Sequence, residues 1–301
     1  MYEQISANKR RSVLLIMGFV ALVVLVGAAL GWIVGYGPAG VGVALVVSAA
    51  LAAGSYWFSD KIALRVSRAV PADEVTYQRL HNLVDGLCIA AGLPKPGVYV
   101  ITDPAPNAFA TGRNPQHAAI AVTTGLLDMM DRVELEGVVA HELSHIRNYD
   151  ILVSTIAVVL LGSITLIADT VIRLSWWNGG RSARSGDHDD RNNPLAFVGF
   201  ALLLVAPLVA KMFQLALSRR RETLADVSAV QLTRYPPGLI SALHKLNADC
   251  TVTHSASRAT AHMWIEQPVA RSESEGRLSG LNRLFDTHPP LTERIALLEE
   301  L

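Results

Sequence analysis

This chain of 301 residues has few cysteines, no formal net charge and no basic stretch interleaved with aromatic residues. It contains two cysteines, Cys88 and Cys250, which we interpret as free thiols because both fall in polar segments predicted to face the cytoplasm. The 26 lysines and arginines equal the 26 aspartates and glutamates, so the formal net charge is zero. Since no basic patch is interleaved with aromatic residues, the sequence does not support nucleic-acid binding.

A cleavable signal peptide is also not expected. Lys9, Arg10 and Arg11 precede an apolar run, as they would in a signal peptide, but Val13 to Val34 contains no charge and is longer than the usual apolar segment of about 7 to 15 residues. No clear cleavage site follows it. The run exceeds the roughly 20 residues that cross a bilayer core, so it predicts a retained membrane anchor.

Three further apolar runs predict three further transmembrane helices. They are Ala39–Phe58, Ile151–Ile172, which holds only Asp169, and Leu195–Leu217, which holds only Lys211. The clusters of basic residues that flank the runs mostly fall on one side of the predicted membrane: Lys9, Arg10 and Arg11, then Lys61, Arg65 and Arg68, then Arg219, Arg220 and Arg221. Although Arg181, Arg184 and Arg191 in loop 175–194 oppose this pattern, the majority predicts that both termini are cytoplasmic.

The sequence His141-Glu142-Leu143-Ser144-His145 is an HExxH motif. On a helix of about 3.6 residues per turn, His141 and His145 lie one turn apart on one face, so both can bind one metal ion. Glu142 then lies where it can take a proton from a metal-bound water. This is the core of a zinc peptidase site. Coincidence is a minor alternative, since the motif arises by chance in about 1% of chains of this length.

A zinc site of this kind needs a third protein ligand. Residues 218–226 (SRRRETLAD) form a continuous helical pattern without glycine or proline, and place Glu222 and Asp226 on one face. Glu222 is the candidate third ligand, and Asp226 the candidate carboxylate that hydrogen-bonds a ligand histidine. The alternative is an exposed charged helix in which Arg219 or Arg221 pairs with these acids.

Two other patterns in the sequence bear on the third ligand. The metzincin pattern is excluded, because Asn148 and Ile151 stand where it requires glycine and histidine. His288, which precedes two prolines, is a candidate for the edge of the metal site, and the alternative is an ordinary turn residue.

Several motifs in this order resemble the HtpX-type membrane metalloproteases, and more distantly the CAAX prenyl endopeptidases. They are HELSHIRNYD (141–150), SRRRETLAD (218–226), THPP (287–290) with ERI (293–295), NAFATG (107–112), AIAVTTGLL (119–127) and ATAHM (259–263). Together they cover most of the chain. Thr223 departs from the aromatic residue we associate with the family, which concerns local packing but no ligand.

The resemblance implies that His141, His145 and Glu222 bind one zinc ion per chain and that Glu142 is the catalytic base and acid. It implies that Asp226 supports a ligand. It also implies that other residues lie near the site, or stabilise the oxyanion of the transition state: His288, Arg294 and Asn148.

The same resemblance implies a substrate-binding edge strand, along which an extended peptide adds as a further strand. Its residues are Asn107, Ala108, Phe109 and Ala110. For Phe109, core packing is the alternative.

The predicted fold is an α-helical membrane protein with four transmembrane helices and a small, mostly helical α/β catalytic domain of zincin type. We expect a transmembrane hairpin (1–60), a first catalytic part (61–150), a second hairpin (151–217) with polar loop 175–194, and a second catalytic part (218–301). Helices are predicted at 73–91, 131–148, 237–248 and 291–301, and strands at 97–101 and 118–123. Residues 178–193 and 272–280 are predicted to be mobile.

The predicted function is that of a membrane-anchored zinc endopeptidase in the cell membrane, which cleaves unfolded or damaged membrane proteins at the cytoplasmic face. The resemblance implies a role in protein quality control and the stress response. One alternative is a metal-binding but inactive membrane scaffold. Another, ranked third, is a transporter or channel, which would place functional charges deep within the spans. The sequence makes no prediction of oligomeric state.

Overall fold

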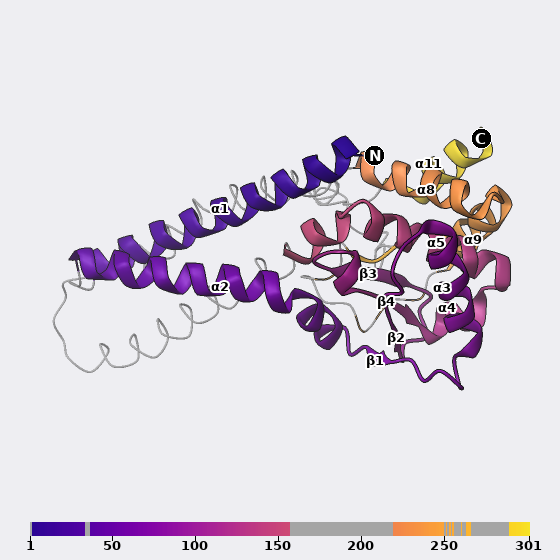
Figure 1. Cartoon of the computed structure of the whole chain (residues 1–301), viewed down its shortest axis with the longest axis horizontal. Helices are drawn as coiled ribbons and strands as arrows, with labels where there is room; N and C mark the ends of the chain where they lie inside the picture. The colour runs from indigo at the N-terminus through magenta and orange to yellow at the C-terminus, as the bar shows by residue number, and fades with distance from the viewer. Residues whose placement is uncertain are drawn as a thin grey trace, which may run out of the picture.

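The computed structural model describes residues 2–33, 37–156, 219–249 and 289–301, together with short pieces at 251, 253, 255, 260 and 263–265. Most of the third and all of the fourth apolar run lie outside the described residues, as do loop 178–193, the stretch 272–280, Cys250 and His288. The described chain forms a long helical hairpin joined to a compact body of helices around a small sheet (Figure 1).

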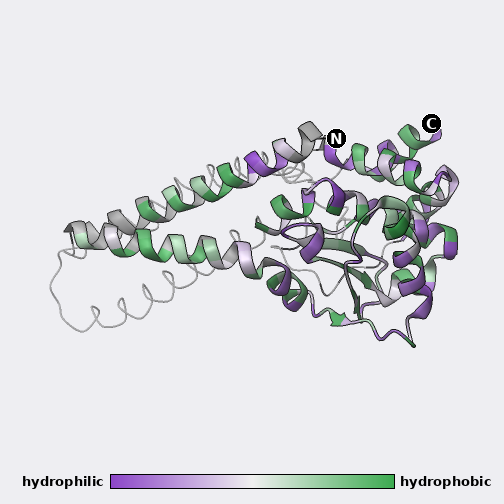
Figure 2. Cartoon of the chain, in the orientation of Figure 1, coloured by the Kyte–Doolittle hydropathy of each residue, from purple (hydrophilic) through white to green (hydrophobic). Residues whose placement is uncertain are grey.

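The hairpin consists of α1 (Tyr2–Ile33) and α2 (Gly37–Val66), which pack along each other and project away from the body (Figure 1). α1 contains the first apolar run as far as Ile33, and α2 contains the second, as Figure 2 shows by hydropathy. Many large apolar side chains on them are exposed: Val13, Leu14, Met17, Val43, Leu45, Val46, Val47, Leu51, Trp57 and Phe58. Among the described residues, no helix has both the length and the hydropathy that a bilayer crossing requires.

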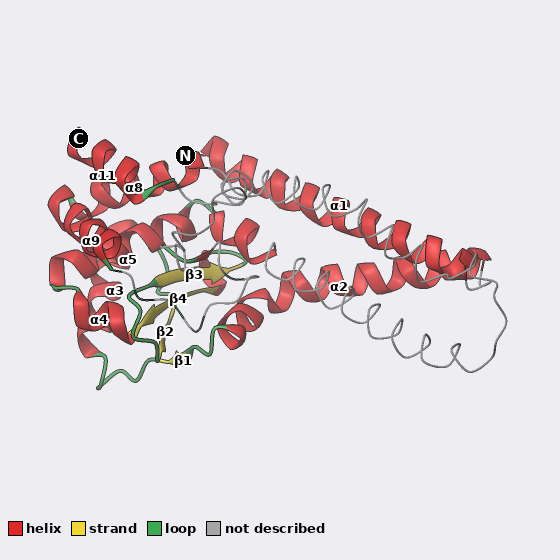
Figure 3. Cartoon of the chain, turned by 180° about the vertical axis from the view of Figure 1, so that it is seen from behind, coloured by secondary structure: helices red, strands yellow, loops and turns green. Residues whose placement is uncertain are grey.

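The sheet has four strands, β1 (Val70–Pro71), β2 (Gly97–Ile101), β3 (Ala108–Gly112) and β4 (Ala118–Thr123), in the order β1-β2-β4-β3. β2 and β4 are parallel, while β1 and β3 pair antiparallel with β2 and β4. The predicted strands at 97–101 and 118–123 are confirmed. The mixed sheet therefore leaves β3 at one edge, on the side of the helix that carries the HExxH motif (Figure 3).

Helices surround this sheet: α3 (Gln78–Ala91), α4 (Thr124–Met129), α5 (Arg132–Arg147), α8 (Arg219–Thr233), α9 (Pro236–Ala248) and α11 (Leu291–Glu299), with a short 3-10 turn at Pro115–His117. α5 lies centrally and packs against α8, α9, α3 and β3. The core combines β-branched side chains of the sheet, including Val100, Ile120 and Val122, with apolar side chains of α5, α9 and α11. The fold is thus mostly helical with a small mixed sheet.

The predicted helix at 73–91 begins five residues late, at Gln78. The Asp73 carboxylate accepts hydrogen bonds from the backbone N–H and the hydroxyl of Thr76, both at 2.7 Å, and so holds a turn before the helix. The helix ends as predicted at Gly92, whose φ of 66° lies in the left-handed region that glycine adopts without strain. Cys88 on this helix is a buried free thiol, and burial raises its pKa to about 11.

Candidate metal centre

The HExxH motif lies on α5, whose start is fixed by the sequence. The Asp131 side chain accepts from the Glu134 backbone N–H, and the Glu134 carboxylate accepts from the Asp131 N–H, which together form a capping box. Gly137 allows α9 to approach closely, since a Cβ there would lie 2.8 Å from the Leu239 backbone nitrogen. The motif turn of α5 is therefore buried on most sides.

The three predicted ligands converge. His141 and His145 lie one turn apart on α5 with their Nε2 atoms 3.1 Å apart, and Glu222 comes from α8. The Glu222 carboxylate oxygens lie 3.6 Å from His141 Nε2 and 3.7 Å from His145 Nε2. Within the described part of the chain, these three side chains form the group able to hold a metal ion.

This donor set fits zinc. Two donors bound tetrahedrally to one Zn²⁺ at about 2.0 to 2.2 Å lie about 3.3 to 3.6 Å from each other. The separations of 3.1, 3.6 and 3.7 Å are close to these values. Two neutral imidazoles and a carboxylate are also a ligand set that catalytic zinc uses, with its fourth position left for water.

Asp226 lies directly behind His141. Its Oδ1 lies 2.8 Å from His141 Nδ1, and the carboxylate is completely buried. A buried carboxylate behind a ligand imidazole fixes the ring orientation and leaves Nε2 directed at the metal. Glu222 and Asp226 are therefore not the exposed acids of the alternative interpretation, because both are buried against α5.

Arg294 on α11 secures Asp226 from the other side. Its Nη2 and Nε donate to the two Asp226 oxygens at 2.6 and 2.8 Å, and its Nη1 donates to the Ile265 carbonyl at 3.3 Å. Arg294 was predicted near the site as a residue that could stabilise an oxyanion. The described contacts support positioning of Asp226, whereas direct contact with an oxyanion stays a prediction.

His145 has a supporting carboxylate that sequence reasoning missed. Asp150 Oδ2 lies 3.1 Å from His145 Nδ1, and Asp150 is buried. The chain returns toward His145 because Tyr149, just beyond α5, has a φ of 61°. That conformation is rare for a residue other than glycine or asparagine, and nothing in the local sequence signals it. Asp150 also lies 3.9 Å from Arg221, so this arginine pairs with a different acid from those proposed.

The carboxylates control protonation of the two histidines in the metal-free protein. Burial lowers the pKa of His141, but Asp226 and Glu222 more than offset this and raise the pKa to about 9. Burial likewise lowers the pKa of His145, which the Glu222 charge and the hydrogen bond to Asp150 raise overall. Burial raises the pKa of Asp226, but Arg294 and His141 dominate and lower it. The surrounding carboxylates therefore favour a positive charge on the two imidazoles of the metal-free site.

The other predicted site residues fall in different places. Glu142 is buried on α5 beside the ligands. Asn148 caps the end of α5, and its carbonyl accepts a hydrogen bond from the Asn8 side chain. Asn107 precedes β3, and Ala108, Phe109 and Ala110 belong to it, all of them buried. Phe109 packs edge-on against Trp264, which agrees with the core-packing alternative for this residue.

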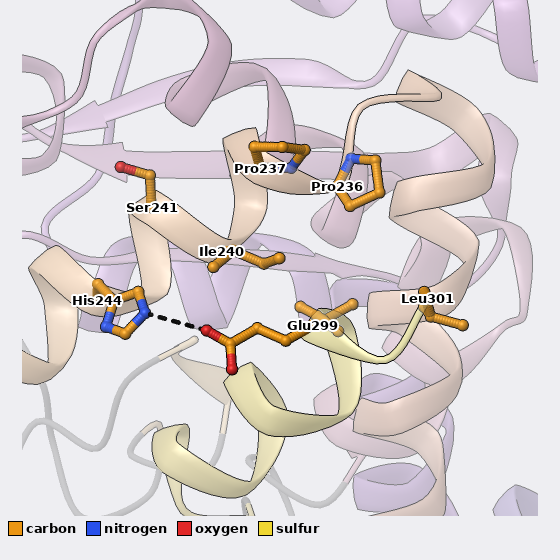
Figure 4. Close-up of a pocket in the computed structure, with 8 residues that line it drawn as sticks. Pro236, Pro237, Ile240, Ser241, His244, Glu299 and Leu301 are labelled. Carbon is orange, nitrogen blue, oxygen red and sulfur yellow. Dashed lines mark ion pairs between the residues drawn. The ribbon is translucent and has the colours of Figure 1, made fainter.

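A separate surface pocket of about 540 Å³ lies between α9 and α11 (Figure 4). It is lined by Pro236, Pro237, Ile240, Ser241, His244, Leu298, Glu299 and Leu301, none of which is a candidate ligand. His244 and Glu299 approach to 3.9 Å across it, and both side chains are more than half exposed. The metal centre is thus distinct from this pocket.

Comparison with known proteins agrees with the site geometry. The model of Peptidase family M48 matches residues 74–301. Proteins described as protease HtpX homologs are similar along the whole chain: the one from Streptococcus uberis is 42% identical, and the one from Lactobacillus helveticus 43%, each with 100% of both chains covered. The one from Caldanaerobacter subterraneus is 42% identical and is covered to 98%.

A solved structure, the crystal structure of S. mikatae Ste24p, is similar with a TM-score of 0.49 and 20% identity, over 85% of this chain and 57% of that one. The similarity is too low to add to the assignment. The family match and the full-length relatives are sufficient without it, and they coincide with the His141, His145 and Glu222 cluster. The chain therefore belongs to peptidase family M48, among its HtpX-type proteases, and is a zinc metalloendopeptidase.

Proposed function

We propose that this endopeptidase is anchored in the cell membrane and cleaves unfolded or damaged membrane proteins at the cytoplasmic face. The observation that carries the proposal is the position of α1 relative to the metal centre. Asn8 contacts residues beside His145, and the apolar run of the same helix begins at Val13. At a rise of 1.5 Å per residue, the apolar run starts only about 8 Å along the helix from this contact.

The exposed apolar side chains of α1 and α2 support the anchor. The surface of a soluble protein rarely carries so many apolar side chains together. In a bilayer, the hydrocarbon of the lipid would cover them, so that they would not be exposed to water. The division into two transmembrane hairpins and two catalytic parts, with cytoplasmic termini, belongs to this proposal. Its test is extraction: an anchored protein stays in the membrane fraction after an alkaline carbonate wash, and release into the supernatant would contradict the proposal.

The proposed chemistry assigns the proton transfers to Glu142. When bound, zinc supplies a coordinated water of lowered pKa and polarises the peptide carbonyl. Glu142 would accept a proton from the attacking water and return it to the leaving amine. Asp226 and Asp150 hold the two imidazoles in the tautomer that leaves Nε2 free for the metal.

The experiment that tests these roles compares cleavage and zinc content in purified variants. Glu142→Gln should retain zinc and lose cleavage of an unfolded membrane protein, whereas Glu222→Ala should lose zinc. Glu136→Gln is the matched control, because it makes the same change on α5 outside the ligand set. If Glu142→Gln cleaves as fast as the unmodified protein, the role of Glu142 is wrong. If the protein prefers folded soluble substrates, the proposed substrate class is wrong.

We also propose that the substrate pairs with β3, the edge strand nearest α5. Thr123 N–H donates to the Asn107 carbonyl, so the backbone groups of Asn107 and of every second residue after it face β4. The residues between them, Ala108, Ala110 and Gly112, therefore direct their backbone N–H and carbonyl groups away from β4. The Ala108 carbonyl already accepts from the Ile265 N–H, so a peptide that bonds there must displace Ile265.

Gly112 N–H donates to the Thr155 hydroxyl, which leaves Ala110 as the central pairing position on the outer edge of β3. Replacing Ala110 by proline removes one N–H from this edge. We expect a higher KM for an unfolded substrate, whereas Ala110→Ser, which keeps the N–H, should preserve KM. An unchanged KM in the proline variant would exclude pairing at this position.

A further inference from the structure

We infer that Asn8 of α1 is a positioning residue of the metal centre, which holds Asp150 and, through it, the imidazole of His145. The contacts form a continuous chain. Asn8 Nδ2 donates to Asp150 Oδ1 at 2.6 Å, and the other oxygen of the same carboxylate lies 3.1 Å from His145 Nδ1. The inference concerns the zinc site itself and is independent of the proposed substrate and of the membrane anchor.

Asn8 is held by its surroundings as well as by this bond. It is buried, and the same side-chain nitrogen donates to the Asn148 carbonyl at 2.9 Å, at the end of α5. On the next turn of α1, the buried Ser12 hydroxyl donates to the Asn8 carbonyl at 3.0 Å. One amide group of the N-terminal helix therefore joins the end of the motif helix to the carboxylate behind a ligand.

Asp150 needs such a partner because of its own position. It is a buried carboxylate, and a buried charge is costly unless its oxygens accept hydrogen bonds. Oδ2 faces His145, and Oδ1, which accepts from Asn8, lies 3.9 Å from Arg221 Nη1. The short bond from Asn8 fixes the carboxylate plane, which in turn orients the imidazole toward the metal.

The strained turn between α5 and Asp150 makes this fixation necessary. Tyr149 has a φ of 61°, in the left-handed region, which is strained for a residue with a Cβ. Its ring lies 4.5 Å from the Lys9 ammonium, next to Asn8. Contacts from two successive residues of α1 thus hold the turn that presents Asp150 to His145.

The consequence is that the metal centre extends beyond the segment matched by the family model. That match begins at residue 74, whereas Asn8 lies in the hairpin far before it. The N-terminal helix is then part of the metal centre. Zinc binding is expected to depend on the docking of α1 onto residues 148–150.

The experiment is a double-mutant cycle on zinc affinity, measured in the full chain by competition with a zinc chelator. Removing an outer partner of a metal site typically weakens binding about 10- to 100-fold, and for Asn8→Ala we expect about 10-fold. In an Asp150→Ala background the same change should have less than about a 2-fold effect, because Asn8 acts through Asp150. The absorption of bound Co²⁺ should shift in Asn8→Ala, because loss of the Asn8 contact reorients His145, and an unchanged spectrum would count against the inference.

Two further variants separate positioning from folding. Asn8→Asp has the same shape but replaces the donor by an acceptor facing Asp150, so zinc binding should weaken more than in Asn8→Ala. Ser12→Ala alters the same buried face of α1 without touching Asp150, and should preserve zinc affinity. The inference would be overturned if Asn8→Ala weakened zinc binding equally in the parent and in the Asp150→Ala background, or in neither. Zinc binding by Asn8→Asp as tight as that of the parent would overturn it as well.

Discussion

Replacement of Arg294 by methionine is the sharpest test of how the centre is held. Arg294 is buried, and its guanidinium forms a two-pronged ion pair with the fully buried Asp226. Methionine fills a similar volume without charge. The variant leaves the Asp226 carboxylate buried, with His141 as its remaining described partner.

The expected loss follows from this burial. Removing one partner of a buried ion pair typically costs about 3 to 5 kcal/mol of unfolding free energy, because the other charge stays uncompensated. For a chain of this size, this corresponds to a fall in Tm of roughly 10 °C. Since Asp226 also orients His141, zinc affinity should fall about 10- to 100-fold.

The pH dependence of the loss can be given a sign. Arg294 and His141 lower the folded pKa of Asp226, so this carboxylate contributes stability above its unfolded pKa of about 3.9 and loses it as pH falls through the folded value. The gap between the parent and Arg294→Met is therefore widest above about pH 4, and narrows in acid.

The assay is thermal unfolding of the metal-free protein in detergent, followed by tryptophan fluorescence, with chelator competition for zinc. Arg147→Met is the matched control, because Arg147 is exposed on α5, and its stability should stay within about 0.5 kcal/mol. The double variant Arg294→Met with Asp226→Asn should lose less than the sum of the two single losses. A loss below about 1 kcal/mol, or strictly additive losses, would refute the reasoning.

Three other changes test separate parts of the fold. Burial raises the pKa of Glu134, but hydrogen bonds from Lys245 and Ser241 outweigh it and lower the pKa. Glu134→Gln should therefore lower the unfolding free energy by about 1 kcal/mol at neutral pH, a modest value because Lys245 is partly exposed. The difference in unfolding free energy between the variant and the parent should vanish at acid pH, where Glu134 is protonated. Gly137→Ala should lower the Tm by several degrees, because its Cβ would meet the Leu239 backbone. Removing zinc with a chelator should lower the Tm reversibly, because zinc at 100 times its Kd adds about 2.7 kcal/mol to the unfolding free energy.

Each of these outcomes has a clear contrary result. A Glu134→Gln deficit that persists unchanged in acid would show that the charge is not its cause. Gly137→Ala with parental Tm would show that α5 and α9 can separate freely. A Tm that is insensitive to chelator and to added zinc would show that the three ligands do not hold metal in the folded protein.

The part of the metal centre that could be predicted from the sequence depends on local spacing. His141 and His145 lie on one face wherever the helix forms, and the same holds for Glu222 and Asp226, because four residues span about one turn. The strands at 97–101 and 118–123 were likewise visible as short apolar runs rich in β-branched residues. Helix starts were less certain, since the Asp73 turn competes locally with the helix that begins at Gln78.

Sequence alone therefore determined the family, the ligand types and the pairing of a motif helix with a second ligand helix, because these follow from the chemistry of neighbouring residues. Tertiary structure decided which side chains support those ligands. Asp150 reaches His145 only through the left-handed Tyr149, and Asn8 reaches Asp150 across 142 residues. Arg294 meets Asp226 across 68 residues. No local periodicity records such contacts, because they depend on how whole helices dock rather than on spacing within one of them.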